Sequence, residues 1–298
     1  MAKQRSVTAR RSLKVLVVTV LVIVLGVQLI APALMAIAVT IPLKSRICCE
    51  TPAKFGAEYT DIEFFTNDGL SLSGWYIPPR NGAVIILVHS YYGDRRQTLP
   101  VAEMLYKHGF GLLMFDQRAS GESEGNKRSL GALDIPDLGR AADWVSTYEK
   151  DIRIGVYGCS IGGAISLAGA VKTPTIRAAA LDAPSPLSWF DNMPAFSLRD
   201  PFGLPTMALY YTYVMLITGT TPPASTMENV LKTSDLPILF ISTGQETEFS
   251  AVQAYYETAA EPKFHWNIPG STHCAATISH PQQYEQHLVN FFNSFLLK

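Results

Sequence analysis

The chain opens with one long apolar stretch and then changes to short apolar runs separated by polar segments. Val15–Leu43 contains no charged residue and no histidine, and a helix of that length is long enough to cross a bilayer. It lacks the amphipathic period of a helix that packs one face on a soluble core. After Tyr59, short apolar runs alternate with helical patterns, which predicts an α/β fold.

The apolar runs are rich in β-branched residues and are short enough to be strands. Val84–Val88 is apolar throughout, which favours a fully buried parallel strand. Further strands are predicted at Leu112–Phe115, Ile152–Tyr157, Ile176–Leu181, Pro237–Ile241 and Phe264–Ile268. Near the C-terminus, Gln282–Leu297 repeats its apolar residues at helical spacing, so we expect a final amphipathic helix there.

The segment Gly158–Gly163, with the sequence Gly-Cys-Ser-Ile-Gly-Gly, lies between a predicted strand and the helix-compatible run Ala164–Ala170. A G-x-S-x-G motif in this context predicts a nucleophile elbow with Ser160 at its apex. The turn is so tight that only very small residues fit two positions before and after the serine. The alternative is a glycine-rich turn without chemistry.

A serine nucleophile needs a general base, and His273 is the histidine best placed to serve as one. It follows the last predicted strand, Phe264–Ile268, on a loop that leads to the final helix. In this type of site the chain order is serine, acid, histidine. The alternative is a loop histidine that makes one backbone hydrogen bond.

The oxyanion hole of such a site is built from backbone N–H groups, which are fixed before charge develops. One donor follows the nucleophile and the other follows an earlier strand. We therefore expect the N–H groups of Ile161 and Tyr91 to form it. His89, which ends the strand Val84–Val88, is expected to brace the loop and not to act in catalysis.

These motifs resemble the α/β-hydrolase superfamily of serine esterases, lipases and acyltransferases, over roughly Tyr59–Leu297. Asp61–Pro78, with Asn-Asp-Gly as a hairpin turn, resembles the opening antiparallel pair. His89–Gly93 resembles the H-G-x-x-G oxyanion motif with Ser90 in place of glycine, and Asp116–Ser123 resembles D-x-R-G-x-G-x-S with alanine in place of its first glycine. The resemblance implies a mostly parallel eight-stranded sheet with helices on both faces and a cap insertion.

The acid that should orient His273 remains open between three carboxylates. The family commonly carries H-G-x-x-D after the strand equivalent to Pro237–Ile241, but this chain has no aspartate there. Counting from the end of the strand selects Glu246, and counting from glycine selects the position beside Glu248. Asp182 is a third candidate, because some family members carry the acid one strand earlier.

The charges around the apolar segment predict its orientation. Cationic residues precede or begin it at Lys3, Arg5, Arg10, Arg11 and Lys14, and fewer follow it closely. The positive-inside rule then places the N-terminus in the cytoplasm and the enzyme outside, as a single-pass protein of the cell membrane. A signal peptide cleaved near Ala36-Ile37-Ala38 is the alternative.

The expected organisation is a cytoplasmic N-terminus at 1–14, a membrane anchor at 15–43, a linker at 44–58 and a hydrolase domain at 59–298. The segment between about 183 and 235 fits no strand and is expected to be the cap. Met207–Ile217 within it is an apolar helix candidate that would suit an adaptable apolar pocket. Packing of that helix on the core is the alternative.

Composition narrows the function classes. The 298 residues carry a net charge of −1, and no basic stripe indicates nucleic acid. Zinc-ligand spacing, a phosphate-binding loop and a dinucleotide fingerprint are lacking, so we expect no cofactor or metal. Four cysteines are too few for a disulfide framework, and Cys159 and Cys274, beside the candidate catalytic residues, are expected to pack against the nucleophile elbow.

The resemblance and the motifs together predict a serine hydrolase that cleaves acyl esters of a small molecule or lipid through Ser160, His273 and Glu246 or Glu248. The alternatives within the fold are a peptidase, an amidase or an acyltransferase that uses the same residues. A binding protein that kept the fold without catalysis is a further alternative, because fold alone does not determine function.

Overall fold

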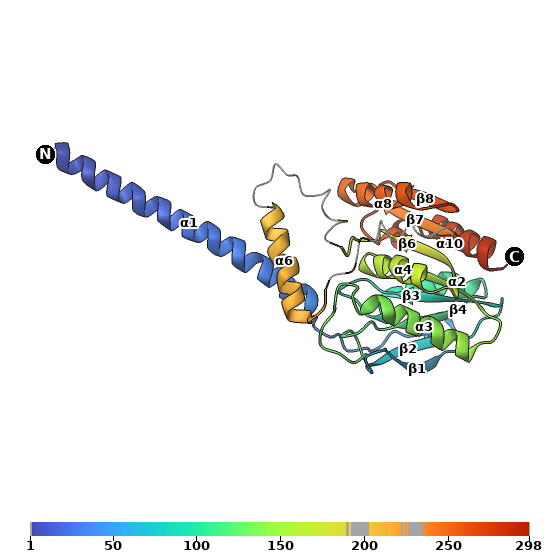
Figure 1. Ribbon diagram of the computed structural model, residues 1–298. Coiled ribbons are helices and arrows are strands. Elements are labelled where there is room, and N and C mark those ends of the chain that lie inside the picture. The colour runs from blue at the N-terminus through green and yellow to red at the C-terminus, as the bar shows by residue number, and fades with distance from the viewer. Residues whose placement is uncertain are drawn as a thin grey trace.

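The computed structural model describes residues 2–188, 191, 203–221, 223, 225 and 235–297 (Figure 1). Within these residues, eight strands form one sheet in the order β1-β2-β4-β3-β5-β6-β7-β8. The strands are β1 Thr60–Phe65, β2 Ser71–Ile77, β3 Ala83–Val88, β4 Gly111–Phe115, β5 Arg153–Cys159, β6 Ile176–Asp182, β7 Ile238–Thr243 and β8 Lys263–Ile268.

Strand directions divide the sheet into a short antiparallel part and a parallel part. β2 is antiparallel to both β1 and β4, whereas the strands from β4 to β8 are parallel to one another. Parallel strands need crossover connections, usually helices, so the sheet is covered on both faces. The predicted fold class is confirmed.

The helices are α1 Ala2–Thr40, α2 Leu99–Lys107, α3 Asp134–Tyr148, α4 Ile161–Lys172, α6 Gly203–Thr218, α8 Glu246–Thr258, α9 Ala276–Ser279 and α10 Pro281–Leu296, with 3₁₀ turns η1 Pro52–Phe55 and η2 Arg95–Thr98. Helices α3, α4 and α8 pack on one face of the sheet, and α2 and α10 pack on the other. α1 extends away from this domain (Figure 1). α6 packs against the C-terminal part of α1.

Strand β3 shows why the core has two halves. Its six side chains are all buried, and they alternate between the faces as a pleated strand requires. Val84, Ile86 and Val88 join the core beneath α3, α4 and α8. Ala83, Ile85 and Leu87 join the core beneath α2 and α10. A run without polar residues is thus explained by burial on both faces.

Most of the elements predicted from sequence occur with boundaries one to four residues away. The predicted hairpin joins β1 and β2, with Gly69 at a φ of 86°. The first helix ends at Thr40, before the predicted end of the apolar segment at Leu43. Leu13–Thr40 is the one candidate membrane span among the described helices, with a mean hydropathy of 2.7. Of the expected cap at 183–235, residues 189–190, 192–202 and most of 222–234 lie outside the described residues.

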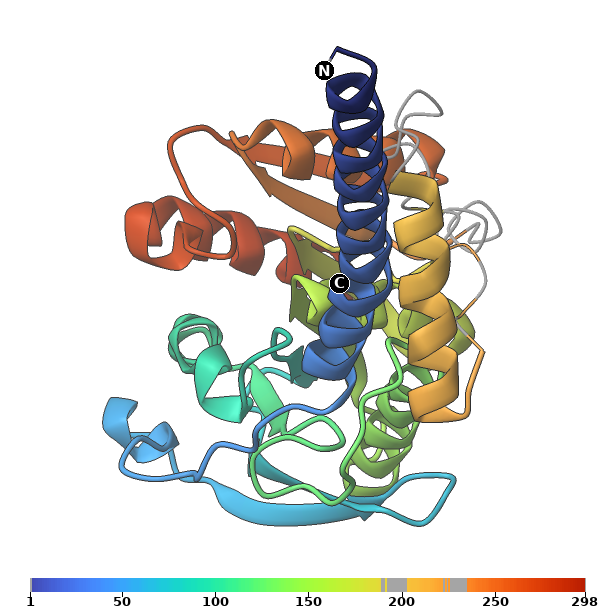
Figure 2. The ribbon, with the colours of Figure 1, turned by 90° about the vertical axis from the view of Figure 1, so that its left-hand side faces the viewer.

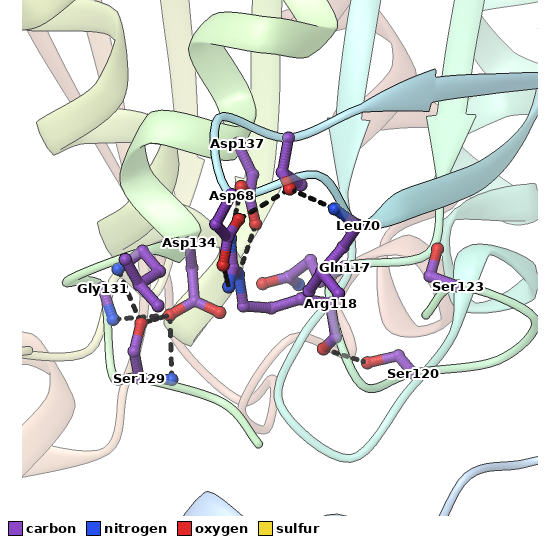
Figure 3. Close-up of polar contacts among 12 residues, drawn as sticks. Asp68, Leu70, Gln117, Arg118, Ser120, Ser123, Ser129, Gly131, Asp134 and Asp137 are labelled. Atoms are coloured by element: carbon purple, nitrogen blue, oxygen red, sulfur yellow. Dashed lines mark hydrogen bonds and ion pairs between the residues drawn. The ribbon is translucent and has the colours of Figure 1, made fainter. Parts of the chain in front are cut away.

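The loop after β4 is held by two ion pairs of the buried Arg118, one with the buried Asp137 and one with the partly exposed Asp68 (Figure 3). The guanidinium of Arg118 donates two hydrogen bonds to Asp137, at 2.6 and 2.8 Å, and two to Asp68, both at 3.0 Å. It thereby joins this loop to α3 and to the β1–β2 turn. Ala119, where the family usually has glycine, adopts a φ of 58°. The motif that contains Arg118 is therefore architectural.

We predict that Arg118→Met lowers the free energy of unfolding by about 3–5 kcal/mol, because it leaves the carboxylate of Asp137 buried without its cation. Urea unfolding of the detergent-solubilised full chain measures the change. Arg140→Met is the control, because Arg140 pairs with Asp143 at the surface, where such pairs contribute about 0–1 kcal/mol. Equal effects of the two substitutions would contradict an architectural role for Arg118.

Candidate active site

Ser160 occupies the tight turn between β5 and α4, with φ 57° and ψ −124°. A Cβ atom on Gly158 would lie 2.2 Å from the carbonyl oxygen of Gly162. A Cβ atom on Gly162 would lie 2.4 Å from the carbonyl oxygens of Val88 and His89. Neither position therefore accepts a side chain, as the sequence predicted. The turn therefore packs closely against the end of β3.

The side chain of Ser160 contacts a histidine that lies more than a hundred residues later in the chain. Its Oγ lies 2.8 Å from Nε2 of His273, on the loop between β8 and α9. The Oγ of Ser185 lies 3.2 Å from the same Ser160 oxygen. The structure thus brings the candidate nucleophile and the candidate base within hydrogen-bond distance.

The other ring nitrogen of His273 faces Glu248. Nδ1 lies 2.6 Å from Oε2 of the glutamate. The second carboxylate oxygen, Oε1, accepts hydrogen bonds from the backbone N–H and the hydroxyl of Thr243, both at 2.7 Å. Because a carboxylate only accepts, Nδ1 carries the proton, which leaves Nε2 free to accept one from Ser160. This tautomer is the one that a general base requires.

The two other candidate acids lie elsewhere. Glu246 is the first residue of α8, and its side chain is exposed. Asp182 is fully buried at the end of β6 and accepts hydrogen bonds from Tyr284 at 2.7 Å and Tyr157 at 3.5 Å. Of the three carboxylates considered from sequence, the structure brings only Glu248 to the ring of His273.

The electrostatics of the pair agree with its geometry. The hydrogen bond to Glu248 raises the pKa of His273 above its usual value, against the opposing effect of burial. Burial acts to raise the pKa of Glu248, but the hydrogen bonds from His273 and Thr243 outweigh it, so this pKa is lowered. The glutamate is therefore ionised near neutral pH and stabilises the protonated imidazole.

The two predicted oxyanion donors lie on either side of the nucleophile turn. Ile161 begins α4 directly after Ser160, and Tyr91 follows β3. Both side chains belong to one apolar cluster, which also contains Val214 of α6 and Ala36 of α1. This cluster connects the backbone around the candidate oxyanion hole with the N-terminal helix.

His89 braces the loop that carries Tyr91. Its Nε2 accepts a hydrogen bond from the backbone N–H of Gln117 at 3.0 Å, so its Nδ1–H donates to the carbonyl oxygen of Ser90 at 2.7 Å. Burial lowers the pKa of His89 to about 3, which keeps the ring neutral. The structural role expected from sequence is consistent with these contacts.

The expected role of Cys159 and Cys274, packing against the nucleophile elbow without a disulfide, was wrong. They form a disulfide that joins residues 115 positions apart, with a Cα–Cα distance of 6.1 Å. This pair was missed from the sequence because disulfides were rejected on the number of cysteines, and that number was not combined with their positions. The available signal was that each cysteine adjoins one member of the Ser160–His273 pair, which any such site must bring together.

No metal-binding site occurs among the residues that the structure describes. No cluster of three or more His, Cys, Asp or Glu side chains there is arranged to hold an ion.

Comparison with known proteins places this geometry in a family. Residues 83–216 match the family model described as the alpha/beta hydrolase fold. The uncharacterized protein YfhR of Escherichia coli O157:H7 is 30% identical over 264 residues, covering 82% of this chain and 84% of that protein. The thiohydrolase aneE of Aspergillus aculeatus is 32% identical over 127 residues, which cover 40% of this chain and 39% of that one.

A solved structure supports the same assignment. An esterase of Pyrococcus furiosus superposes with a TM-score of 0.69 and 25% sequence identity, covering 86% of this chain and 98% of the esterase. The chain belongs to the α/β-hydrolase superfamily. Its esterase and hydrolase neighbours support a hydrolase activity in general.

We predict that Glu248→Gln lowers the pKa of His273, because the neutral amide no longer stabilises the imidazolium. Titration of the histidine ring signals by NMR, in the detergent-solubilised full chain, measures the change, with His273→Asn identifying the signal. Glu246→Gln makes the same chemical change two residues away and should leave the pKa of His273 unchanged. An unaltered pKa of His273 in Glu248→Gln would contradict the pairing.

Proposed function

We propose that this chain is a membrane-anchored serine hydrolase that cleaves carboxylic esters. The observation that carries the proposal is the hydrogen-bonded series of Ser160, His273 and Glu248, with distances of 2.8 and 2.6 Å. Serine alone is a weak nucleophile at neutral pH, and an adjacent oriented base activates it. The three residues follow one another in the order serine, acid, histidine, as in this fold generally.

In the proposed mechanism, Ser160 Oγ attacks the ester carbonyl while His273 Nε2 takes its proton. Glu248 holds the imidazole in the required tautomer and stabilises its protonated form. The N–H groups of Ile161 and Tyr91 stabilise the oxyanion, aided by the N-terminal end of α4. His273 then gives its proton to the leaving alcohol, and water releases the acyl group from Ser160.

The same residues would serve an acyl transfer or the cleavage of a thioester, since the acyl-enzyme is common to these reactions. The thiohydrolase among the relatives favours thioesters as the second candidate. Comparing oxygen esters with thioesters of the same acyl chain distinguishes the two.

The N-terminal helix supports the membrane anchor, and the disulfide supports a location outside the cytosol. The long apolar helix satisfies the length requirement for a span, and cations are concentrated before it. The disulfide between Cys159 and Cys274 is typical of proteins outside the reducing cytosol. We therefore propose an N-terminus at 1–14 in the cytoplasm, an anchor at 15–43, a linker at 44–58 and an extracytoplasmic hydrolase domain at 59–298.

We predict that Ser160→Ala abolishes both labelling by a fluorophosphonate probe and hydrolysis of p-nitrophenyl acetate, because it removes the hydroxyl that lies 2.8 Å from His273 Nε2. Ser185→Ala is the matched control, since its hydroxyl lies beside Ser160 but makes no bond to the substrate in this mechanism. Labelling that survives in Ser160→Ala would remove this serine as the nucleophile.

We further predict that Glu248→Gln lowers kcat by roughly a hundredfold or more, because the imidazole loses its orientation and its countercharge. Glu246→Gln should change kcat by less than about threefold, and KM should shift little in either variant. Steady-state kinetics of both variants, with Asp182→Asn as a third, distinguish the candidates. A large loss confined to Asp182→Asn would move the acid to β6, and near-wild-type activity in all three would indicate a Ser160–His273 dyad.

A last prediction concerns location. The protein should remain in the membrane fraction after carbonate extraction, because the exposed apolar side chains from Leu13 to Ile30 would have to leave the bilayer. Protease added outside spheroplasts should digest the catalytic domain. A soluble product that begins near residue 39 would instead indicate a cleaved signal peptide.

A further inference from the structure

An apolar cavity of about 290 Å³ adjoins the nucleophile turn. Its walls include Ile161, directly after Ser160, and Leu187 on the segment that follows β6. Met207 and Tyr210 of α6 form another wall, and Met35 of α1 borders it from the N-terminal helix. The lining contains no charged side chain, which suits a hydrocarbon ligand.

The C-terminal turns of α1 are part of the catalytic domain. Ala36 is fully buried in the cluster that contains Tyr91 and Val214. Further along α1, Gln28 accepts a hydrogen bond from Thr206 of α6. The two helices lie side by side over this length (Figure 2). One helix thus both extends from the domain and packs behind the candidate oxyanion hole.

The exposed part of α1 overlaps the contact with α6 only in its last turn, at Gln28, and has nearly the length that a bilayer requires. Side chains from Leu13 to Ile30 are almost all exposed, and their helix is about 27 Å long, close to the thickness of the hydrocarbon core. Met35 lies about 7 Å further along the axis and is 56% exposed. The cavity therefore opens close to the level at which α1 leaves the membrane.

The outer surface of α6 fits the same arrangement. Gly203–Thr218 contains no charged residue, and Leu216 and Met215 are 75% and 41% exposed. The end of α6 nearest the span is its N-terminal end, where Thr206 contacts Gln28, whereas Met215 and Leu216 lie near the level of Ala36, with which Val214 packs.

We propose that this cavity binds the acyl chain of an ester taken directly from the bilayer, with α1 and α6 as its membrane-side walls. The proposal rests on the esterase function proposed above. Ser160 would cleave the bond at the inner end of the cavity, while the chain enters beside Met35. The anchor would then serve as part of the acyl-binding site as well as a tether.

Substitution inside the cavity tests this assignment. Met207→Trp should lower the ratio of kcat/KM for p-nitrophenyl dodecanoate to that for the acetate by about tenfold or more, because the larger ring excludes several methylenes. Met215→Trp introduces the same ring on the exposed side of α6 and should change the ratio by less than about threefold. Met207→Ala, which enlarges the cavity, should still hydrolyse the dodecanoate ester.

These results separate two failures. Equal ratios in Met207→Trp and Met215→Trp, with acetate still hydrolysed, would overturn the cavity assignment and leave the esterase function intact. Absence of acetate hydrolysis in the wild-type chain would instead contradict the proposed function itself.

A second experiment tests entry from the membrane. The full chain is reconstituted in phosphatidylcholine vesicles that contain umbelliferyl palmitate, or is mixed with separate vesicles that contain the ester. Umbelliferone should be released at least about tenfold faster when the protein and the ester share one bilayer, because the effective ester concentration at the cavity is then high. Equal rates in the two arrangements would show that the ester arrives through water and would overturn direct entry.

A different observation carries a second inference, which concerns the disulfide. Cys159 precedes Ser160 and Cys274 follows His273, so the bond joins the immediate neighbours of the two reacting residues. His273 lies on a loop and its side chain is 44% exposed, so few packing contacts hold it in place. Cys274 has a φ of 55°, a conformation that side-chain-bearing residues adopt only when their surroundings impose it.

We infer that Cys159 and Cys274 are positioning residues, whose bond keeps His273 Nε2 at hydrogen-bond distance from Ser160. An external dithiol would attack one sulfur, form a mixed disulfide and then close its own ring, which leaves two protein thiols. The protein disulfide is reduced and the dithiol is oxidised in equal amounts. The imidazole would then lose its alignment without any loss of the substrate-binding walls.

The test uses the full chain with Cys48→Ser and Cys49→Ser, so that the disulfide of Cys159 and Cys274 alone responds to the reagent. Dithiothreitol should lower kcat by about tenfold or more, change KM by less than about threefold, and leave the circular dichroism spectrum unchanged. Reoxidation should restore kcat. The variant that also carries Cys159→Ser and Cys274→Ser should have the low kcat and no response to dithiothreitol. Full activity after alkylation-verified reduction would overturn the positioning role.

Discussion

The structure depends on one close approach, between the turn that carries Ser160 and the end of β3. The missing side chains of Gly158 and Gly162 let the backbone of α4 come within contact distance of β5 and of the carbonyl oxygens of Val88 and His89. This contact places the serine at the apex of the turn and directs the first amides of α4 toward it. It also brings the β3 loop, with Tyr91, beside the same point. A larger side chain at either glycine would separate all of these groups.

The parallel sheet gathers the remaining groups at one edge. Ser160 follows β5, Glu248 follows β7 and His273 follows β8, so each lies just beyond the carboxyl end of its strand. Strands β7 and β8 are paired from Ile238 to Thr243, which sets Thr243 near the histidine loop and lets it hold Glu248. The disulfide adds a covalent connection between the first and last of these loops. Residues more than a hundred positions apart thereby reach hydrogen-bond distance.

The N-terminal helix is more closely joined to the site than a simple tether. Its buried residue Ala36 shares a cluster with Tyr91 and Ile161, and α6 packs along it (Figure 2). Movement of α1 relative to the domain would therefore disturb the walls around the nucleophile. Under the proposals made above, an ester of a membrane lipid would meet Ser160 at this junction.

The pattern of residues along the chain was enough to predict the features that depend on local geometry. The glycines around Ser160, the apolar runs of the strands and the period of α10 each act over a few residues, so their pattern predicted the elements correctly. The choice between Glu246 and Glu248 was different, because α8 begins at Glu246 and residues two apart on a helix point in nearly opposite directions. Which of the two faces His273 depends on how the start of α8 packs beside the loop after β8. The pairing of Cys159 with Cys274 and the packing of α1 on α6 also required the tertiary structure, because contacts between distant segments depend on how the whole sheet brings their ends together.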